Sequence, residues 1–329
     1  MKRPGRLAAV LTIVSCAVAI GCGGSDEKSN DLVSAYPSPG TEVASPQTTI
    51  SFVGMDADDP GTVTVTGSKS GEHSGTFEAF AAVDGAAFVP DEPFVAEETV
   101  TVATDHEIAG ADNGEYEFRT ATFRTDAAPP PRNLPKEGKL RIEEQSFKSR
   151  PDLKPPVVDV DVPADERAAD GDFFLSPKAD GPMIVGPEGD LVYFRPDVET
   201  ADFRTQTYKD QPVLTWWEGP FNAGGYTEGT FVIAGQDYRE IQRVRMGNSY
   251  KGDLHEFKLT DRGTAYVPAY RTVLTDLSPM GGPKRGAVLD SVAQEIDLET
   301  GHVLWEWHSM GNVDLDETEI AVPQSPTEA

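Results

Sequence analysis

The chain has 329 residues, of which 38% are hydrophobic, so it is long enough to fold as two domains with buried cores. It carries 28 Lys and Arg against 55 Asp and Glu, a formal net charge of -27. A field of this sign repels phosphate backbones, which excludes nucleic acid as a partner and favours the solvated surface of a secreted protein.

Residues 1–21 have the pattern of a secretory signal peptide. Lys2, Arg3 and Arg6 precede an apolar run that is too short for a membrane-spanning helix, and small residues then lead to Cys22. The tetrapeptide AIGC resembles a bacterial lipobox, in which the cysteine becomes the lipidated first residue. We therefore expect an extracytoplasmic protein that acyl chains on Cys22 hold to the bacterial membrane; secretion without an anchor is the alternative.

The cysteine content agrees with this interpretation. The sequence has two cysteines, Cys16 inside the signal segment and Cys22. Once the signal is removed and Cys22 is acylated, no thiol is left for a disulfide, a nucleophile or a metal site. Residues 22–30 have the flexible polar composition of a tether.

Residues 31–126 contain short strand candidates separated by Gly, Pro and Asp. The candidates are TTISFVG, GTVTVTGSKSG, HSGTFEAF, AAFVP, ETVTVAT and YEFRTATF. Their close spacing, without a helical period, predicts a β-sandwich, and the opening YPSPGTEVASPQTTISF resembles bacterial immunoglobulin-like modules. His73 and His106 lie here without a second ligand at usable spacing, so we interpret them as surface residues.

A domain boundary follows. Pro129, Pro130 and Pro131 are consecutive, which favours a stiff extended spacer, and the sequence stays broken by prolines beyond them. We therefore expect residues 127–170 to be a linker and an extended segment.

From Gly171 onward, apolar strands come in pairs around tight turns. The pairs are GPMIV with LVYFRP, GTFVIAG with EIQRVR, HEFKL with TAYVPAY, and SVAQEIDL with HVLWEWH. Repeated hairpins predict β-propeller blades, and residues 171–318 suffice for about three blades, whereas closed propellers typically have at least about four. We therefore predict an all-β protein with an incomplete propeller, followed by a disordered tail over residues 319–329, from a fragment or a truncated gene product.

Two histidines in this region, His255 and His308, are candidates for a catalytic site. If HEFKL is a strand, alternation places His255, Phe257 and Leu259 on one face, so His255 could line the central channel of a propeller. A histidine that is satisfied inside a packed sheet is the alternative. In VLWEWHSMGN, His308 shares a face with Glu306, whose carboxylate could fix its tautomer.

Other chemistry lacks a motif in this sequence. There is no HExxH, no GxSxG, no phosphate-binding glycine loop and no closely spaced acidic metal cluster. We therefore expect neither a metal nor a cofactor, and no motif supports metalloprotease, hydrolase or kinase activity. His302 follows Gly301 in a turn and is expected to face solvent.

Several long motifs resemble the arylsulfotransferase family, in its lipoprotein-like bacterial branch. They are FKSRPDLKPP, PVLTWWEG, DLHEFKLTDRGTAYVPAY, GAVLDSVAQEIDLETGHVLWEWHS and VDLDET, and they span residues 147–318. The resemblance implies a β-propeller that transfers a sulfuryl group from an aryl sulfate donor to a phenolic acceptor. The implied route is ping-pong through a sulfohistidine, which lets donor and acceptor use one pocket in turn.

The resemblance also assigns roles. His255 matches an early channel histidine that binds sulfuryl oxygens rather than acting as the nucleophile, and His308 matches the histidine of the WHS segment, whose role it leaves open. Asn312 stands where another histidine is usual, and the later segment with the nucleophilic histidine is absent. We therefore expect a truncated and inactive arylsulfotransferase-like protein; the alternative is a surface-anchored binding lipoprotein without catalytic activity.

Overall fold

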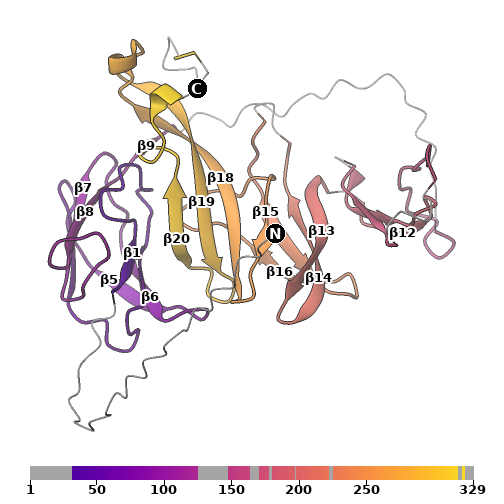
Figure 1. Cartoon of the computed structure of the whole chain (residues 1–329), viewed down its shortest axis with the longest axis horizontal. Helices are drawn as coiled ribbons and strands as arrows, with labels where there is room; N and C mark the ends of the chain where they lie inside the picture. Colours follow the sequence, from indigo (N-terminus) through magenta and orange to yellow (C-terminus); the bar gives the residue numbers. More distant parts are fainter. Residues whose placement is uncertain are drawn as a thin grey trace, which may run out of the picture. The chain divides into compact units, whose positions relative to one another are not determined.

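The computed structural model describes residues 32–124, 147–163, 170–177, 180–196, 198–221, 225–317 and 321–322. In these residues the regular structure consists of antiparallel β-sheets and short 3-10 turns such as η2 (Ser278–Met280) and η3 (Leu315–Glu317) (Figure 1). The prediction of an all-β protein is confirmed. Cys22, the tether and most of the linker and tail lie outside the described residues. Within the described part, no helix is both long and apolar enough to cross a membrane.

The N-terminal region contains two four-stranded sheets. One has the order β1 (Ser34–Tyr36), β2 (Ile50–Val53), β6 (Gly85–Pro90), β5 (Gly75–Ala79), and the other β4 (Gly71–His73), β3 (Val63–Gly67), β7 (Thr99–Thr104), β8 (Glu115–Arg119). In β8 the sequence EYEFR alternates exposed and buried positions, so Tyr116 and Phe118 enter the core. Phe52 and Phe88 from the first sheet join Phe118 from the second in one hydrophobic cluster. The two sheets therefore bury a common core.

The next strand, β9 (Thr122–Phe123), pairs with a strand far along the chain. Val273 of β18 (Thr264–Thr275) lies opposite Phe123 in the register. The segment YEFRTATF is therefore divided between two sheets. β9 connects the N-terminal sheets directly to the last sheet of the protein.

Three further sheets follow, and in each of them strands adjacent in sequence are adjacent in space. The first is β10 (Phe173–Leu175), β11 (Met183–Val185), β12 (Leu191–Phe194); the second is β13 (Thr200–Tyr208), β14 (Gln211–Glu218), β15 (Thr230–Ala234), β16 (Glu240–Val244). The third is β17 (Lys258–Leu259), β18, β19 (Gly286–Asp297), β20 (Val303–His308), with β18 and β19 forming a long hairpin (Figure 1). The four predicted strand pairs are confirmed as β11–β12, β15–β16, β17–β18 and β19–β20.

The hairpin of β13 and β14 was not predicted. Its turn residues Lys209 and Asp210 both have positive φ, 49° and 59°. This conformation suits a two-residue hairpin turn, but Lys-Asp lacks the glycine that usually marks one in a sequence.

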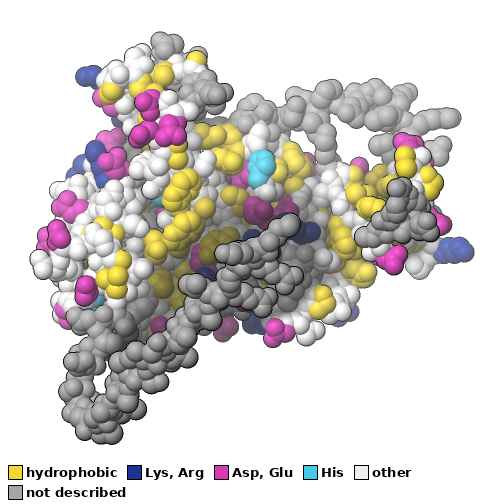
Figure 2. All heavy atoms as spheres, in the orientation of Figure 1, with side chains coloured by type: hydrophobic (Ala, Val, Ile, Leu, Met, Phe, Trp, Pro, Cys, Tyr) yellow, Lys and Arg dark blue, Asp and Glu magenta, His cyan; other side chains and the backbone are white. Residues whose placement is uncertain are grey.

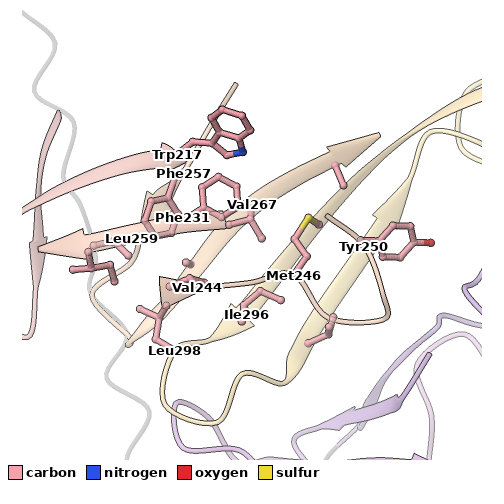
Figure 3. Close-up of a cluster of buried hydrophobic side chains, with 14 of the residues drawn as sticks. Trp217, Phe231, Val244, Met246, Tyr250, Phe257, Leu259, Val267, Ile296 and Leu298 are labelled. Carbon is pink, nitrogen blue, oxygen red and sulfur yellow. The ribbon is translucent and has the colours of Figure 1, made fainter. Parts of the chain in front are cut away.

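The second and third of these sheets share a core. Trp217, Phe231 and Phe257 are fully buried, and the rings of Phe231 and Phe257 stack with centroids 4.7 Å apart (Figure 3). Val267 of β18 and Ile296 of β19 complete the same cluster. Each fully buried aromatic side chain stabilises a fold by about 1.5–3 kcal/mol, so this cluster holds the two sheets together.

Polar contacts join the N-terminal sheets to the last sheet. Asp297 of β19 accepts hydrogen bonds from the backbone N–H groups of Ala81 and Ala82, at 2.7 and 2.9 Å. His302 hydrogen-bonds Glu78 through Nε2 at 2.9 Å, and its side chain is only 16% exposed. The prediction that His302 faces solvent is therefore wrong, because the N-terminal sheets cover it.

Candidate functional site

His255 lies in a turn before β17 rather than in a strand. The strand expected to begin at His255 begins at Lys258, and the side chain of His255 is 54% exposed while Phe257 and Leu259 are buried. The expectation that these three residues share one strand face is therefore wrong. The reason is local: the carboxylate of Asp253 accepts the backbone N–H of His255 at 3.1 Å, which favours a turn over an extended chain.

The segment before His255 is fixed by close backbone packing. Gly252 forms a bridge with Gly229, and its carbonyl accepts a hydrogen bond from Trp217 Nε1 at 2.9 Å. A Cβ on Gly252 would stand 2.4 Å from the Phe231 ring, so only glycine fits between strand and core. The buried aromatic cluster therefore sets the position of Asp253.

The carboxylate of Asp253 is buried and fully used. Its Oδ2 accepts from the backbone N–H and the hydroxyl of Thr227, at 2.7 and 3.1 Å. Its Oδ1 accepts the backbone N–H of His255 and also contacts Nδ1 of the imidazole. A buried carboxylate with this many donors is a rigid anchor for the histidine ring.

The other side of the imidazole faces outward beside aromatic rings. Tyr270 lies edge-on to His255, with ring centroids 6.4 Å apart, and Tyr226 lies 6.0 Å from Tyr270. Nε2 of His255 has no hydrogen-bond partner among the residues that the structure describes. The site thus combines a half-exposed imidazole, whose Nε2 has no partner in the described residues, with phenol rings that offer apolar surface.

Arg204 is the cation next to this site, and carboxylates hold it. It pairs with Asp202 at 3.1 Å and with Glu256, and it donates to the carbonyl of Phe257 at 2.7 Å. Burial raises the pKa of Asp202 to about 6, although the charge of Arg204 opposes that rise. Arg204 therefore fixes the 256–257 backbone rather than offering its charge to an anion.

His308 occupies a different environment. It is 4% exposed, and its Nε2 bonds Glu306 Oε1 at 2.9 Å, as the strand alternation predicts. Asp290 of β19 bonds Nδ1 at 2.6 Å, a partner that the sequence analysis missed. Burial acts to lower the pKa of His308, but the hydrogen bonds to Asp290 and Glu306 outweigh it and raise the pKa to about 9.

A histidine in this state has no lone pair for chemistry at neutral pH, because both ring nitrogens carry protons and donate them. Its partner Glu306 also accepts from Asn248 at 2.8 Å, and Asn248 in turn accepts the backbone N–H of Thr49. The geometry is that of a buried ion-pair network that links β19 and β20 to the N-terminal sheets. The catalytic role predicted for His308 stays a prediction, and nothing in this geometry supports it.

The remaining histidines have protein partners. Nε2 of His73 contacts the hydroxyl of Ser70 at 2.7 Å, and Nε2 of His106 contacts the carbonyl of Pro60 at 2.9 Å. Across the described ranges, no three or more His, Cys, Asp or Glu side chains are grouped so that they could hold a metal ion. Asp and Glu side chains are spread over the face shown in Figure 2, in keeping with the net charge of -27.

One comparison with known proteins identifies a relationship. Residues 204–328 match the family model described as arylsulfotransferase (ASST). The matched stretch is less than half of the chain. The matched stretch contains His255 and His308, whereas the motif at residues 147–156 lies outside it. No curated protein matches the chain. The C-terminal part of this chain is therefore similar to arylsulfotransferases.

Proposed function

We propose that this chain handles aryl sulfates in an arylsulfotransferase-type site built around His255. The observation that supports this most directly is the half-exposed side chain of His255, anchored through Nδ1 and flanked by Tyr270, inside the stretch that matches the family model. When the ring carries both protons, its Nε2–H donates to a sulfuryl oxygen, and the tyrosine rings pack against the aryl group.

The proposed reaction follows a ping-pong route. An imidazole nitrogen of a histidine other than His255, whose position the sequence does not give, takes the sulfuryl group as the S–O bond to the donor phenol breaks, and the phenolate leaves with the electron pair. The acceptor phenol then attacks the sulfur, loses its proton to water and restores the imidazole. In this scheme His255 stabilises the negative charge on the sulfuryl oxygens in both steps.

The architecture and location form a second part of the proposal. Three successive sheets with meander order support propeller blades, and two four-stranded sheets with one core support an immunoglobulin-like sandwich. Acyl chains on Cys22 would anchor the protein outside the cytoplasm. A Cys22→Ala variant that stays in the membrane fraction after bacterial expression would refute the anchor.

A single-turnover assay tests the activity. The protein is incubated with a chromogenic aryl sulfate, with and without excess phenol, beside a His255→Ala variant and a His106→Ala control from the N-terminal sheets. Release that depends on phenol in wild type and control, and that falls by roughly 10²-fold or more in His255→Ala, supports the proposal. Absence of release from wild type refutes it for this chain and points to a binding lipoprotein instead.

A further inference from the structure

The hydrogen bonds of the five histidines set His255 apart. Among the described residues, Nε2 contacts a protein acceptor or donor in His73, His106, His302 and His308, but not in His255. His255 is also the residue whose Nδ1 contacts a carboxylate while most of the side chain stays exposed. The asymmetry leaves one nitrogen bound to the protein and the other directed outward.

The carboxylate that binds Nδ1 is held on every side. The backbone N–H of Asp253 donates to the carbonyl of Pro268 at 2.8 Å, which ties it to β18. Its Oδ2 accepts two hydrogen bonds from Thr227, and the same Thr227 hydroxyl accepts the N–H of Leu254 at 3.0 Å. Asp253 therefore cannot turn away from His255 without breaking buried hydrogen bonds.

A carboxylate accepts hydrogen bonds and cannot donate them when ionised, so the ring nitrogen that faces it must carry a proton. In the neutral ring the lone pair is then at Nε2, and in the protonated ring the second proton is at Nε2. Either way, Nε2 is the atom that changes its state and meets a ligand.

We infer that Asp253 is a positioning residue for His255, which holds the Nδ1–H form of the imidazole and directs Nε2 to the substrate. Thr227 holds Asp253 in turn. The part of this inference that concerns substrate rests on the proposed function, whereas the state of the imidazole can be measured without any substrate.

The first test is NMR of the full ¹⁵N-histidine-labelled chain, with the His255 signals assigned by their loss in His255→Gln. We expect the neutral fraction of the wild-type ring to carry its proton at Nδ1, and a shift of that proton towards Nε2 in Asp253→Asn, whose amide presents a donor. Asp237→Asn is the matched control, because Asp237 accepts the backbone N–H of Arg239 two residues later but faces no histidine. A neutral wild-type ring with its proton at Nε2 overturns the inference by itself. An unchanged spectrum in folded Asp253→Asn overturns it as well.

The second test is turnover of a chromogenic aryl sulfate with a phenol acceptor. Asp253→Asn should lower kcat/KM by roughly 10²–10⁴-fold, as a misoriented or wrongly protonated histidine does, while Asp237→Asn keeps wild-type values. Thr227→Val, which keeps the backbone donor and removes the hydroxyl, should give a smaller loss in the same direction. Equal rates in wild type and folded Asp253→Asn contradict the positioning role. A wild type without turnover refutes the proposed function, and the NMR result then decides the tautomer separately.

Discussion

The buried ion-pair network around His308 makes the stability of this protein depend on pH in a specific direction. The pKa of His308 is raised from 6.5 to about 9, which corresponds to about 3 kcal/mol of unfolding free energy. Because the pKa is higher in the folded protein than in the unfolded chain, this contribution is complete below about pH 6.5. It is lost as the pH rises through about 9.

The perturbation that tests this is His308→Gln. It removes the cation and leaves the carboxylates of Asp290 and Glu306 buried without a charge partner, so we expect a loss of about 3–5 kcal/mol near pH 6. Near pH 10 the wild-type ring is neutral as well, so the difference between the two proteins should shrink to about 1–2 kcal/mol.

Urea unfolding followed by tryptophan fluorescence measures this directly. The four tryptophans, Trp216, Trp217, Trp305 and Trp307, all lie in the sheets that contain or contact the network. The unfolding free energy is compared at several pH values between about 6 and 10, with His106→Gln as the control for losing a surface histidine. A wild type that loses no more stability over this range than His308→Gln does would show that His308 is not held as a cation.

Two further predictions concern the contact between sheets and the aromatic side of the site. Asp297→Asn should lower the unfolding free energy by about 1–3 kcal/mol at pH 7 in the same assay, because the carboxylate of Asp297 accepts four backbone N–H groups. Burial acts to raise the pKa of Asp297, but these hydrogen bonds outweigh it and lower the pKa, so the difference from wild type should fade as the pH falls through that lowered pKa. A difference that stays constant with pH would contradict this. Tyr270→Ala should raise KM for an aryl sulfate by about 2–10-fold with little change in kcat, because the Tyr270 ring lies beside His255. The control Tyr238→Ala, in the exposed turn between β15 and β16, should leave KM unchanged. Equal effects of the two substitutions would show that Tyr270 is not part of the site.

Short-range patterns were enough to predict most of the strand pairs. The four hairpins found in the sequence have turn residues such as Glu-Gly-Asp or Asp-Arg-Gly between apolar runs, and their pairing depends on neighbours only a few residues apart. The pairing of Glu306 with His308 was predictable for the same reason, since residues two apart on a strand share a face. The turn at Lys209 and Asp210 was not predicted, because both residues have positive φ but neither is the glycine that usually indicates such a turn in a sequence.

Only the tertiary structure decided the surroundings of the two candidate histidines. Asp290 is 18 residues before His308, and the β19–β20 register brings them together; the hydrogen bonds to Asp290 and Glu306 then outweigh burial and make that ring a cation. For His255 the sequence alone indicated the residue type and placed it at the start of the strand HEFKL, whereas the structure puts it in the turn before β17. The bridge between Gly252 and Gly229 and the hydrogen bonds from Thr227 decided that Asp253 is buried beneath it and that Nε2 faces outward. Such contacts join segments distant in sequence, so no local period or spacing encodes them.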